Sequence, residues 1–263
     1  MSNVDELLAG GDIRGARSAL IEEVRANPGD PRVRMFLFQL CALTGEWDRA
    51  KSQADTLGKL DPAAKMLAVA YSQCIDAEAK RAAVMAGQEP VALLSPVPWG
   101  DALAEGIRLR QTGDTLADEA LHRAFEDAET SAGTLDDGTS FEWIADADPR
   151  FGPTIEAIIA GRYGLMPFSA LEALTIHPPQ DLRDKVWIPA EFSLRQGARV
   201  AGFVPVRYPG SEVSDDPAIV LGQATDWIEA NGGEAGLGQR LLVLSDGSER
   251  PLMSVRRIDF ADA

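Results

Sequence analysis

Two stretches decide the fold: GDIRGARSALIEEVRANP at residues 11–28 and GEWDRAKSQADTLGKLDP at residues 45–62. Aligned without gaps, they carry a glycine followed by an acid, then a small residue, then a helix stop at matching positions. The matching pairs are Gly11 with Gly45, Ala16 with Ala50 and Pro28 with Pro62. Each pair is 34 residues apart, which is a period of helical-hairpin repeats.

Each recurring residue has a physical role in a helical hairpin. A glycine permits the tight turn, an alanine lets two helices approach closely, and a proline prevents the second helix from continuing. A third turn of the register is degraded, because Ala79 and Val84 replace the turn glycine and the small alanine. Residues 63–88 are therefore expected to form one longer helix. A plain helical bundle with an accidental period is the alternative.

The amino-acid composition and spacing change near residue 132. Before it, Ala, Leu, Arg and Glu recur at helical spacing, whereas Gly, Pro, Val and Trp follow in short alternating runs. We expect an α+β chain: a tetratricopeptide-like helical-repeat domain at residues 1–132, then a β-rich, barrel- or sandwich-like domain at residues 133–263. The glycine-rich stretch 232–238 is expected to be a loop. Strands are expected at residues 161–166, 170–176, 185–194, 199–206, 219–229, 239–244 and 250–258.

The chain is strongly acidic. Its formal net charge of −16 argues against a nucleic-acid partner, because binding to phosphates needs a basic surface. Residues 114–148 alone hold eleven acids against one basic residue, Arg123. A solvated helix face would explain this run, and the sharper interpretation is a docking surface for a basic partner segment. The residues expected to form that acidic docking surface are Asp114, Asp118, Glu119, Glu126, Asp127 and Glu129.

Motifs of the common enzyme classes are missing from the sequence. It has no G-x-x-x-x-G-K-[ST] phosphate loop, no G-x-S-x-G elbow, no H-E-x-x-H and no C-x-x-C. We expect no catalytic residue, no cofactor, no metal and no small-molecule substrate. An acid/base enzyme would have to use Asp146 with Asp148, or Asp215 with Asp216. Both pairs are expected to lie in solvated turns.

The sequence also predicts where the protein works. No apolar stretch approaches the roughly 20 residues needed to span a bilayer, and the acidic start does not read as a secretory leader. Cys41 and Cys74 lie in apolar helical runs, where free cysteine behaves as a small hydrophobic residue. We therefore expect a cytoplasmic protein with no membrane partner and no disulfide framework.

The repeat template predicts a partner-binding groove on the inner helix faces. Methionine side chains adapt to apolar anchors, and amide side chains bond to the polar edge of a bound helix. The alternative is that the two methionines are core residues. The predicted groove consists of Arg32, Met35 and Gln39 from the second repeat and Met66, Val69 and Gln73 from the third.

Five phrases of the carboxyl half resemble one protein family. They are FEWIADADPRFGP at 141–153, HPPQDLRDKVWIPAEFSLRQG at 177–197, VPVRYPGS at 204–211, ATDWIEANGG at 224–233 and GLGQRLLVL at 236–244. In this order they are similar to the ImpE family, also called SciE or TagJ, whose members are accessory proteins encoded with bacterial type VI secretion systems. The resemblance extends over essentially the whole chain.

The resemblance implies a cytoplasmic, non-enzymatic adaptor. On that basis we expect the chain to bind a helix of the small sheath subunit and to associate with the AAA+ ATPase that recycles contracted sheath. The residues alone leave three alternatives open. These are a general peptide-binding or chaperone-like scaffold of another pathway, an acid/base enzyme using carboxylates of the C-terminal domain, and a structural brace within a larger assembly.

Overall fold

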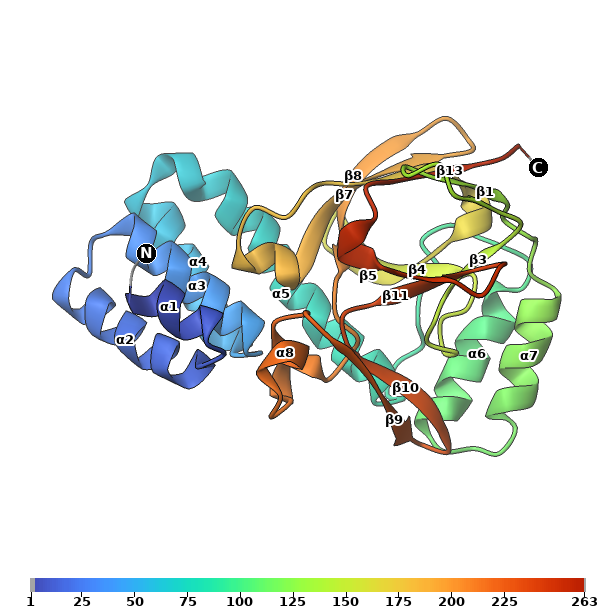
Figure 1. The fold of residues 1–263 in the computed structure, drawn as a ribbon, viewed down its shortest axis with the longest axis horizontal. Helices are drawn as coiled ribbons and strands as arrows, with labels where there is room; N and C mark the ends of the chain where they lie inside the picture. The colour runs from blue at the N-terminus through green and yellow to red at the C-terminus, as the bar shows by residue number, and fades with distance from the viewer. Residues whose placement is uncertain (1–2, 263) are drawn as a thin grey trace.

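A helical half and a strand-rich half make up the molecule (Figure 1). The computed structural model describes residues 3–262. In Figure 1 the first helices lie at one end, α5 runs toward the sheets, and α6 with α7 flanks the strand-rich half. The helices are α1 (Asn3–Ala9), α2 (Ile13–Ala26), α3 (Pro31–Leu43), α4 (Trp47–Leu60), α5 (Lys65–Met85), α6 (Gly100–Gln111), α7 (Ala117–Glu126) and the short α8 (Pro217–Val220).

The repeat register is confirmed as two helical hairpins, α1–α2 and α3–α4. Gly11 and Gly45 form their turns with φ of +78° and +68°, a region that residues with side chains rarely adopt. Helices α2 and α4 end before Pro28 and Pro62. Across residues 3–90 the described chain contains no strand, as the repeat period predicted.

The acid that follows each turn glycine is used in two different ways. Asp12 caps α2, since its side chain accepts a hydrogen bond from the backbone N–H of Gly15 at 2.8 Å. Glu46 makes no such cap. Instead its carboxylate pairs with Arg17 of the first hairpin, with Nη2 and Oε2 separated by 2.6 Å. The equivalent acids therefore stabilise one helix end and one contact between hairpins.

Helix α5 replaces the degraded third repeat and links the two halves. It is 21 residues long, as the loss of the turn glycine predicted. Its Tyr71 lies among three aromatic rings, with centroid distances of 5.7 Å to Phe38, 6.0 Å to Trp187 and 5.2 Å to Phe203. Because Phe38 belongs to α3 while the other two rings come from the sheet, this tyrosine packs the repeats onto the strand-rich half.

The strand-rich half contains antiparallel sheets that do not close into a barrel. The largest has the order β2-β1-β13-β6-β7-β8-β4-β5, and smaller sheets pair β12-β11-β3 and β10-β9. The strands are β1 (Gly133–Leu135), β2 (Ser140–Phe141), β3 (Ile144–Asp146), β4 (Thr154–Ile159), β5 (Arg162–Pro167), β6 (Leu171–Ile176), β7 (Trp187–Leu194), β8 (Arg199–Pro205), β9 (Thr225–Ala230), β10 (Gly233–Gly238), β11 (Leu241–Leu244), β12 (Glu249–Pro251) and β13 (Arg257–Phe260).

Three strand expectations are wrong in detail. The run 219–229 divides into α8 and β9, because Asp216 caps a helical turn that begins at Pro217. The run 250–258 is interrupted by a 3₁₀ turn at Leu252–Ser254. The glycine-rich stretch 232–238 is strand β10 rather than a loop. A Cβ on Gly236 would lie 2.4 Å from Cδ2 of Tyr208, so glycine is needed there for close approach, not for a turn.

Two hydrophobic cores hold the elements together. The first contains buried residues of α1 to α7 together with Trp187, Tyr208 and neighbours from the strand-rich half. The second lies among the strands and includes Phe168, Phe192 and Leu242. The helical half and the sheets therefore share one core, while the sheets possess a second of their own.

Candidate functional site

A buried network of charges joins α5 to the sheets. Glu156 of β4 accepts hydrogen bonds from Arg81 of α5, at 2.8 Å from Nε and 2.7 Å from Nη2. It also accepts from the hydroxyl of Tyr163 at 2.5 Å and pairs with Arg240. Burial alone would raise the pKa of Glu156, but the guanidinium groups of Arg81 and Arg240 lower it to about 2. Glu156 is therefore ionised and fully paired.

Asp146 is the second carboxylate of this network. It pairs with Arg240 and accepts a hydrogen bond of 2.8 Å from the hydroxyl of Tyr208. Burial raises the pKa of Asp146 to about 6, against the opposing effect of Arg240. Arg240 thus lies between Asp146 and Glu156, and its guanidinium bridges two strands.

The two carboxylate pairs considered for acid/base chemistry lie in different environments, one buried and one exposed. Asp146 and Asp148 are buried, so the expectation of a solvated turn is wrong for them. Asp148 forms an ion pair with Arg150, whose Nη2 lies 2.6 Å from Oδ2. Asp215 and Asp216 are exposed, and Asp216 caps α8. The buried pair is bound to arginines that hold the fold together, because unpaired buried charges are strongly disfavoured.

The six predicted groove residues divide between two places on the helical half. Those from α3 line a hollow of about 320 Å³: Arg32, Met35 and Gln39. On α5, Gln73 lines a different hollow of about 300 Å³, where the helix meets β4, β7 and β8. Met66 and Val69 precede it on the same helix and are 84 % and 54 % exposed. A role for these residues in partner binding stays a prediction.

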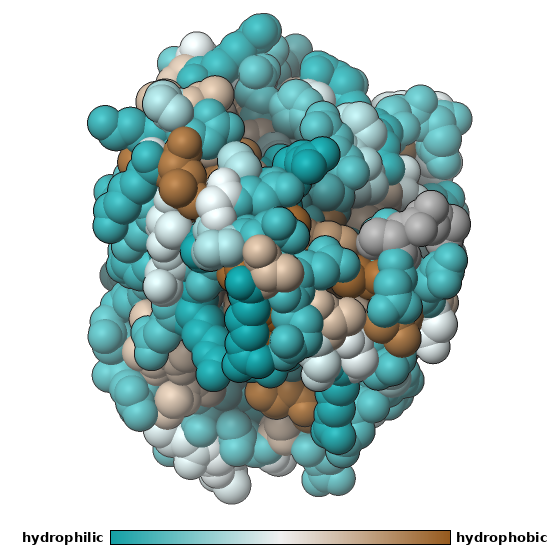
Figure 2. Space-filling view, turned by 90° about the vertical axis from the view of Figure 1, so that its left-hand side faces the viewer, coloured by the Kyte–Doolittle hydropathy of each residue, from teal (hydrophilic) through white to brown (hydrophobic). Residues whose placement is uncertain are grey.

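The two methionines differ in environment. Met66 is open to solvent and is not a core residue, whereas Met35 packs against the shared core. Figure 2 shows the end of the molecule formed by the helical half, where hydrophilic side chains dominate and hydrophobic ones form separate small patches. Exposed large apolar residues at 60–69 comprise Leu60, Met66 and Val69.

A segment of the strand-rich half covers one side of α3. It is the 3₁₀ turn Leu182–Lys185, which begins with a capping box between Asp181 and Asp184. The segment lines a hollow of about 590 Å³ together with Phe36 and Gln39 of α3. The same two α3 residues line the 320 Å³ hollow, so the hollows adjoin at α3.

The contacts of this segment were not predicted from the sequence. The guanidinium of Arg183 lies 5.1 Å from the ring centroid of Tyr71, and its Nη1 is 3.7 Å from Sδ of Met35. Asp181 and Gln39 line the same hollow. The acid spacing of a capping box is visible in the sequence, but nothing local indicates which distant helix the turn covers.

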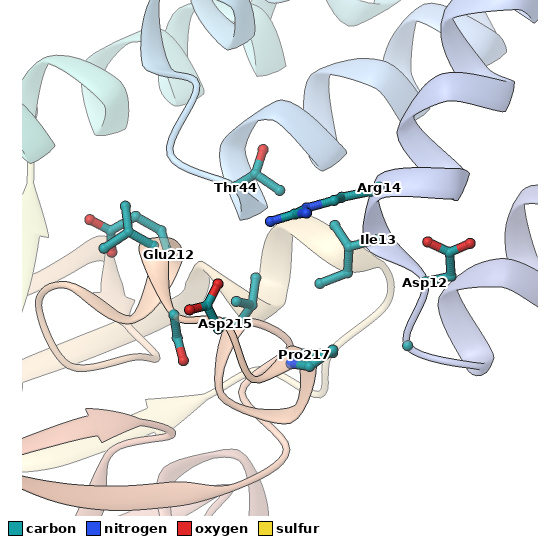
Figure 3. A pocket seen from close by; sticks show the side chains of 11 residues that line it. Asp12, Ile13, Arg14, Thr44, Glu212, Asp215 and Pro217 are labelled. Carbon is teal, nitrogen blue, oxygen red and sulfur yellow. The ribbon is translucent and has the colours of Figure 1, made fainter.

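A further hollow, of about 580 Å³, lies between the repeat turns and the loop at residues 211–217. Figure 3 shows Arg14 and Thr44 on the helical side of this hollow, with Glu212, Asp215 and Pro217 across from them. The loop approaches both turns closely. A Cβ on Gly45 would lie 2.6 Å from Cγ of Glu212, and one on Gly11 would lie 3.4 Å from Cβ of Pro217.

The predicted acidic docking surface lies on and around α7. All six of its carboxylate residues are exposed. Two of them pair with nearby arginines: Asp118 with Arg110, and Glu119 with Arg123 at 2.9 Å. Asp114 accepts a hydrogen bond from the backbone N–H of Leu116 near the start of the helix. The remaining charge faces solvent, and docking of a partner here stays a prediction.

The described chain offers neither a cluster of metal ligands nor a membrane-spanning helix. Among residues 3–262, no three His, Cys, Asp or Glu side chains gather so that they could hold a metal ion. Over that same stretch, no helix combines the length and the apolar character needed to cross a membrane.

Two comparisons with known proteins, by family model and by sequence, agree on one family. The ImpE protein family model matches residues 138–259. The type VI secretion system accessory component TagJ of Pseudomonas aeruginosa is 40 % identical over 258 residues, which cover 97 % of this chain and 90 % of TagJ. The crystal structure of a Vibrio parahaemolyticus protein has the same fold, with a TM-score of 0.88 at 24 % identity and coverage of 100 % of this chain and 98 % of that one. Because this chain is similar to TagJ along almost its whole length, it belongs to the ImpE family of type VI secretion accessory proteins.

Proposed function

We propose that the protein is a cytoplasmic, non-enzymatic adaptor of a type VI secretion system. In this proposal it binds a helix of the small sheath subunit and associates with the AAA+ ATPase that recycles contracted sheath. Membership of the family supports the accessory role in secretion. The observation that carries the helix-binding part is the exposed apolar face of α5.

That face has the spacing expected of a helix-binding surface. Met66 and Val69 are three residues apart and Gln73 follows four residues later, so the three share one side of α5. Large apolar side chains exposed together favour a protein-interaction surface over a solvated helix. Gln73 supplies an amide at the end of the row, which suits the polar edge of a helix lying in a groove.

The acidic docking surface supports a role for a basic partner segment. Glu126 ends α7, Asp127 and Glu129 lie just beyond it, and all three are exposed. Clustered charge of one sign raises the association rate of a partner of opposite charge more than it lowers the dissociation rate. We assign this surface to partner association rather than to the helix-binding step.

Calorimetric titration with a synthetic helix of the small sheath subunit tests the proposal. Replacing Met66 and Val69 together by alanine should weaken binding roughly tenfold, a loss of about 1.4 kcal/mol, without lowering the melting temperature. Val213→Ala is the matched control, because Val213 is also apolar and 78 % exposed but belongs to the loop at residues 211–217, outside both proposed surfaces. Its binding should equal that of the unmodified protein.

Two results would redirect the interpretation. Unchanged affinity in the Met66 and Val69 variant would remove α5 from the binding surface. Equal affinity for unrelated amphipathic helices would favour a general peptide-binding scaffold over a sheath-specific adaptor.

A further inference from the structure

Strand β9 is paired on one side only. It forms a two-stranded sheet with β10, and no other strand of the described chain pairs with its outer edge. The pairing continues one step beyond β9, where the backbone N–H of Gln239 donates to the carbonyl of Ala224 at 2.8 Å. Residues of an antiparallel strand bond to their neighbour alternately, so the even-numbered residues of β9 bond to β10. Its odd-numbered residues therefore direct their backbone N–H and C=O groups outward.

Few of the outward N–H groups have a partner. The N–H of Trp227 donates to the carboxylate of the preceding Asp226, with N and Oδ1 separated by 2.9 Å. No acceptor of residues 3–262 meets the N–H of Thr225 or that of Glu229. A sheet edge with unpaired backbone groups is a template on which a further strand can bind. The backbone of β9 thus offers the hydrogen bonds of a strand-binding site.

The hairpin that carries this edge is held from both of its faces. On one face, the ring centroids of Trp227 and Tyr208 are 5.9 Å apart. On the other face, the guanidinium of Arg110 lies so close to Gly233 that a Cβ would not fit there. In Figure 1 the hairpin extends from the strand-rich half beside α6. The outer edge of β9 is therefore already formed before a partner arrives.

Two acidic side chains of the hairpin oppose each other. Glu229 and Glu234 are exposed cross-strand partners, in a pair without backbone hydrogen bonds, where side chains lie closest. Like charges placed directly opposite destabilise a sheet. Among residues 3–262 no basic side chain forms an ion pair with either carboxylate. A cation supplied from outside the chain would relieve this repulsion.

We propose that β9 binds an extended basic segment of a partner protein, which adds as a further strand along its outer edge. Cross-strand neighbours share a face, so one basic side chain of the segment lies beside Glu229 and reaches towards Glu234. A second basic side chain lies beside Asp226, which is exposed on the other face. An apolar side chain lies beside Ile228, which is 40 % exposed. The segment thus carries two basic residues three positions apart with an apolar residue between them.

A second copy of this chain is a poorer occupant of the edge. Pairing β9 with β9 would bring Asp226 and Glu229 of one copy close to those of the other, which adds repulsion. A basic segment is also favoured by the neighbouring charge, because Arg110 lies against Gly233 and pairs with Asp118 of the acidic docking surface. The edge belongs to other elements than the α5 face, so strand addition does not depend on the binding of a sheath helix.

Fluorescence anisotropy of a labelled peptide added to the full-length protein tests strand addition. The probe has about ten residues, mostly threonine and valine, with two lysines three positions apart and a valine between them. Glu229→Gln removes one charge and should weaken binding about threefold. Glu229→Pro also removes the outward N–H and should weaken binding at least about tenfold. Proline is tolerated at this position, because the N–H that it removes does not bond to β10.

A charge reversal within the hairpin gives a second test. Glu234→Lys supplies the missing cation from the chain itself, so the variant should melt no lower than the unmodified protein. The same lysine competes with the basic segment for Glu229 and should weaken peptide binding at least about tenfold. A peptide in which glutamates replace both lysines should not bind to any form of the protein.

Edge strand β12 provides the matched control. Glu249 is exposed at the start of that strand and pairs with Val243. Its N–H also points outward, because the N–H of Leu244 donates to the carbonyl of Ser248 in the adjacent, bonded pair. Glu249→Gln and Glu249→Pro should bind the lysine peptide as the unmodified protein does.

Three results would overturn the proposal. They are no binding of the lysine peptide, equal binding of the glutamate peptide, and equal affinities of Glu229→Gln and Glu229→Pro, which would mean attraction by charge without strand addition. If Glu229→Pro does not fold, hydrogen exchange of the unmodified protein decides, because the bound peptide should protect the amides of Thr225 and Glu229. Binding of the sheath-subunit helix should be the same in every variant, so the failure of either proposal leaves the other standing.

Discussion

Arg240 illustrates how charge is accommodated in the interior of this fold. Its guanidinium pairs with Asp146 and Glu156 and lies 4.9 Å and 4.8 Å from the ring centroids of Phe151 and Tyr208. The pKa of Asp146 is nevertheless raised and that of Glu156 is lowered. Glu156 has a second guanidinium, that of Arg81, whereas Asp146 has none.

The raised pKa of Asp146 predicts a pH dependence of stability. Its value of about 6 in the folded protein exceeds the value of about 3.9 for an unfolded chain. Between these limits the folded state keeps a proton that the unfolded chain releases. Lowering the pH from 7 to 5 should therefore add about 1 kcal/mol to the free energy of unfolding through this group. Glu156 opposes this only below about pH 4.3, the unfolded value for glutamate.

Urea denaturation at pH 7, 6 and 5 measures this effect. Asp146→Asn should lose the gain, so the difference from the unmodified protein should widen by about 1 kcal/mol over that range. Asp215→Asn controls for removing an exposed carboxylate. Parallel pH profiles for Asp146→Asn and the unmodified protein would contradict the raised pKa.

At the scale of elements, the turn at Gly45 needs both a positive φ and close contact with Glu212. Its φ of +68° resembles the +69° of Gly113, but only Gly45 lies against Glu212. Gly113→Ala should cost about 1 kcal/mol, since it places a side chain in the left-handed region. Gly45→Ala should cost clearly more, because its Cβ would also displace Glu212. Equal losses in chemical denaturation would show that the loop contact contributes nothing.

Helix α7 allows a test of electrostatic steering. Changing Glu126 and Glu129 to glutamine and Asp127 to asparagine should slow association with a basic partner and flatten its salt dependence, while dissociation stays constant. Stopped-flow or surface-based kinetics with the sheath subunit and the ATPase would measure both rates. The control neutralises three exposed acids of the large sheet: Glu172, Glu191 and Asp259. A kinetic profile indistinguishable from this control would make α7 an ordinary solvated face.

The sequence predicted elements whose cause is local. The hairpins follow from glycine, alanine and proline at fixed spacing, and the long α5 follows from their loss at Ala79 and Val84. Strand β10 was missed because Gly236 is required by the close approach of the Tyr208 ring, a contact made only in the folded chain. The cover of α3 by Arg183 was missed for the same reason. Local patterns do not encode which distant surfaces meet.

The candidate site was predictable in part. The repeat template put Met66 and Val69 on one inner helix face, and in the structure both are exposed on α5. The acids singled out around α7 are exposed too. The template did not anticipate that the α3 residues would be separated from those on α5. It also gave no indication that Asp146 and Asp148 would be buried. Asp146 pairs with Arg240, which is distant in the sequence, and Asp148 pairs with Arg150 within a turn.

For the whole molecule, the shared core predicts that both halves unfold together. Far-ultraviolet circular dichroism is dominated by the helices, whereas tryptophan fluorescence also reports on Trp143, Trp187 and Trp227 of the strand-rich half, so the two thermal transitions should coincide. Arg81→Met removes one partner of buried Glu156 and should cost about 3 to 5 kcal/mol, moving both midpoints equally. Two resolved transitions, or a shift in one signal alone, would mean that the halves are energetically independent.

The loop at residues 211–217, which touches the turns at both Gly11 and Gly45, also constrains how this architecture evolves. Helical-repeat arrays commonly lengthen by duplicating a unit, since each unit contacts only its neighbours. Here a duplicated hairpin between the two would carry the Gly11 turn out of reach of Pro217. The number of hairpins is thus constrained by a segment that begins 166 residues after Gly45, so an added hairpin requires a compensating change in that loop.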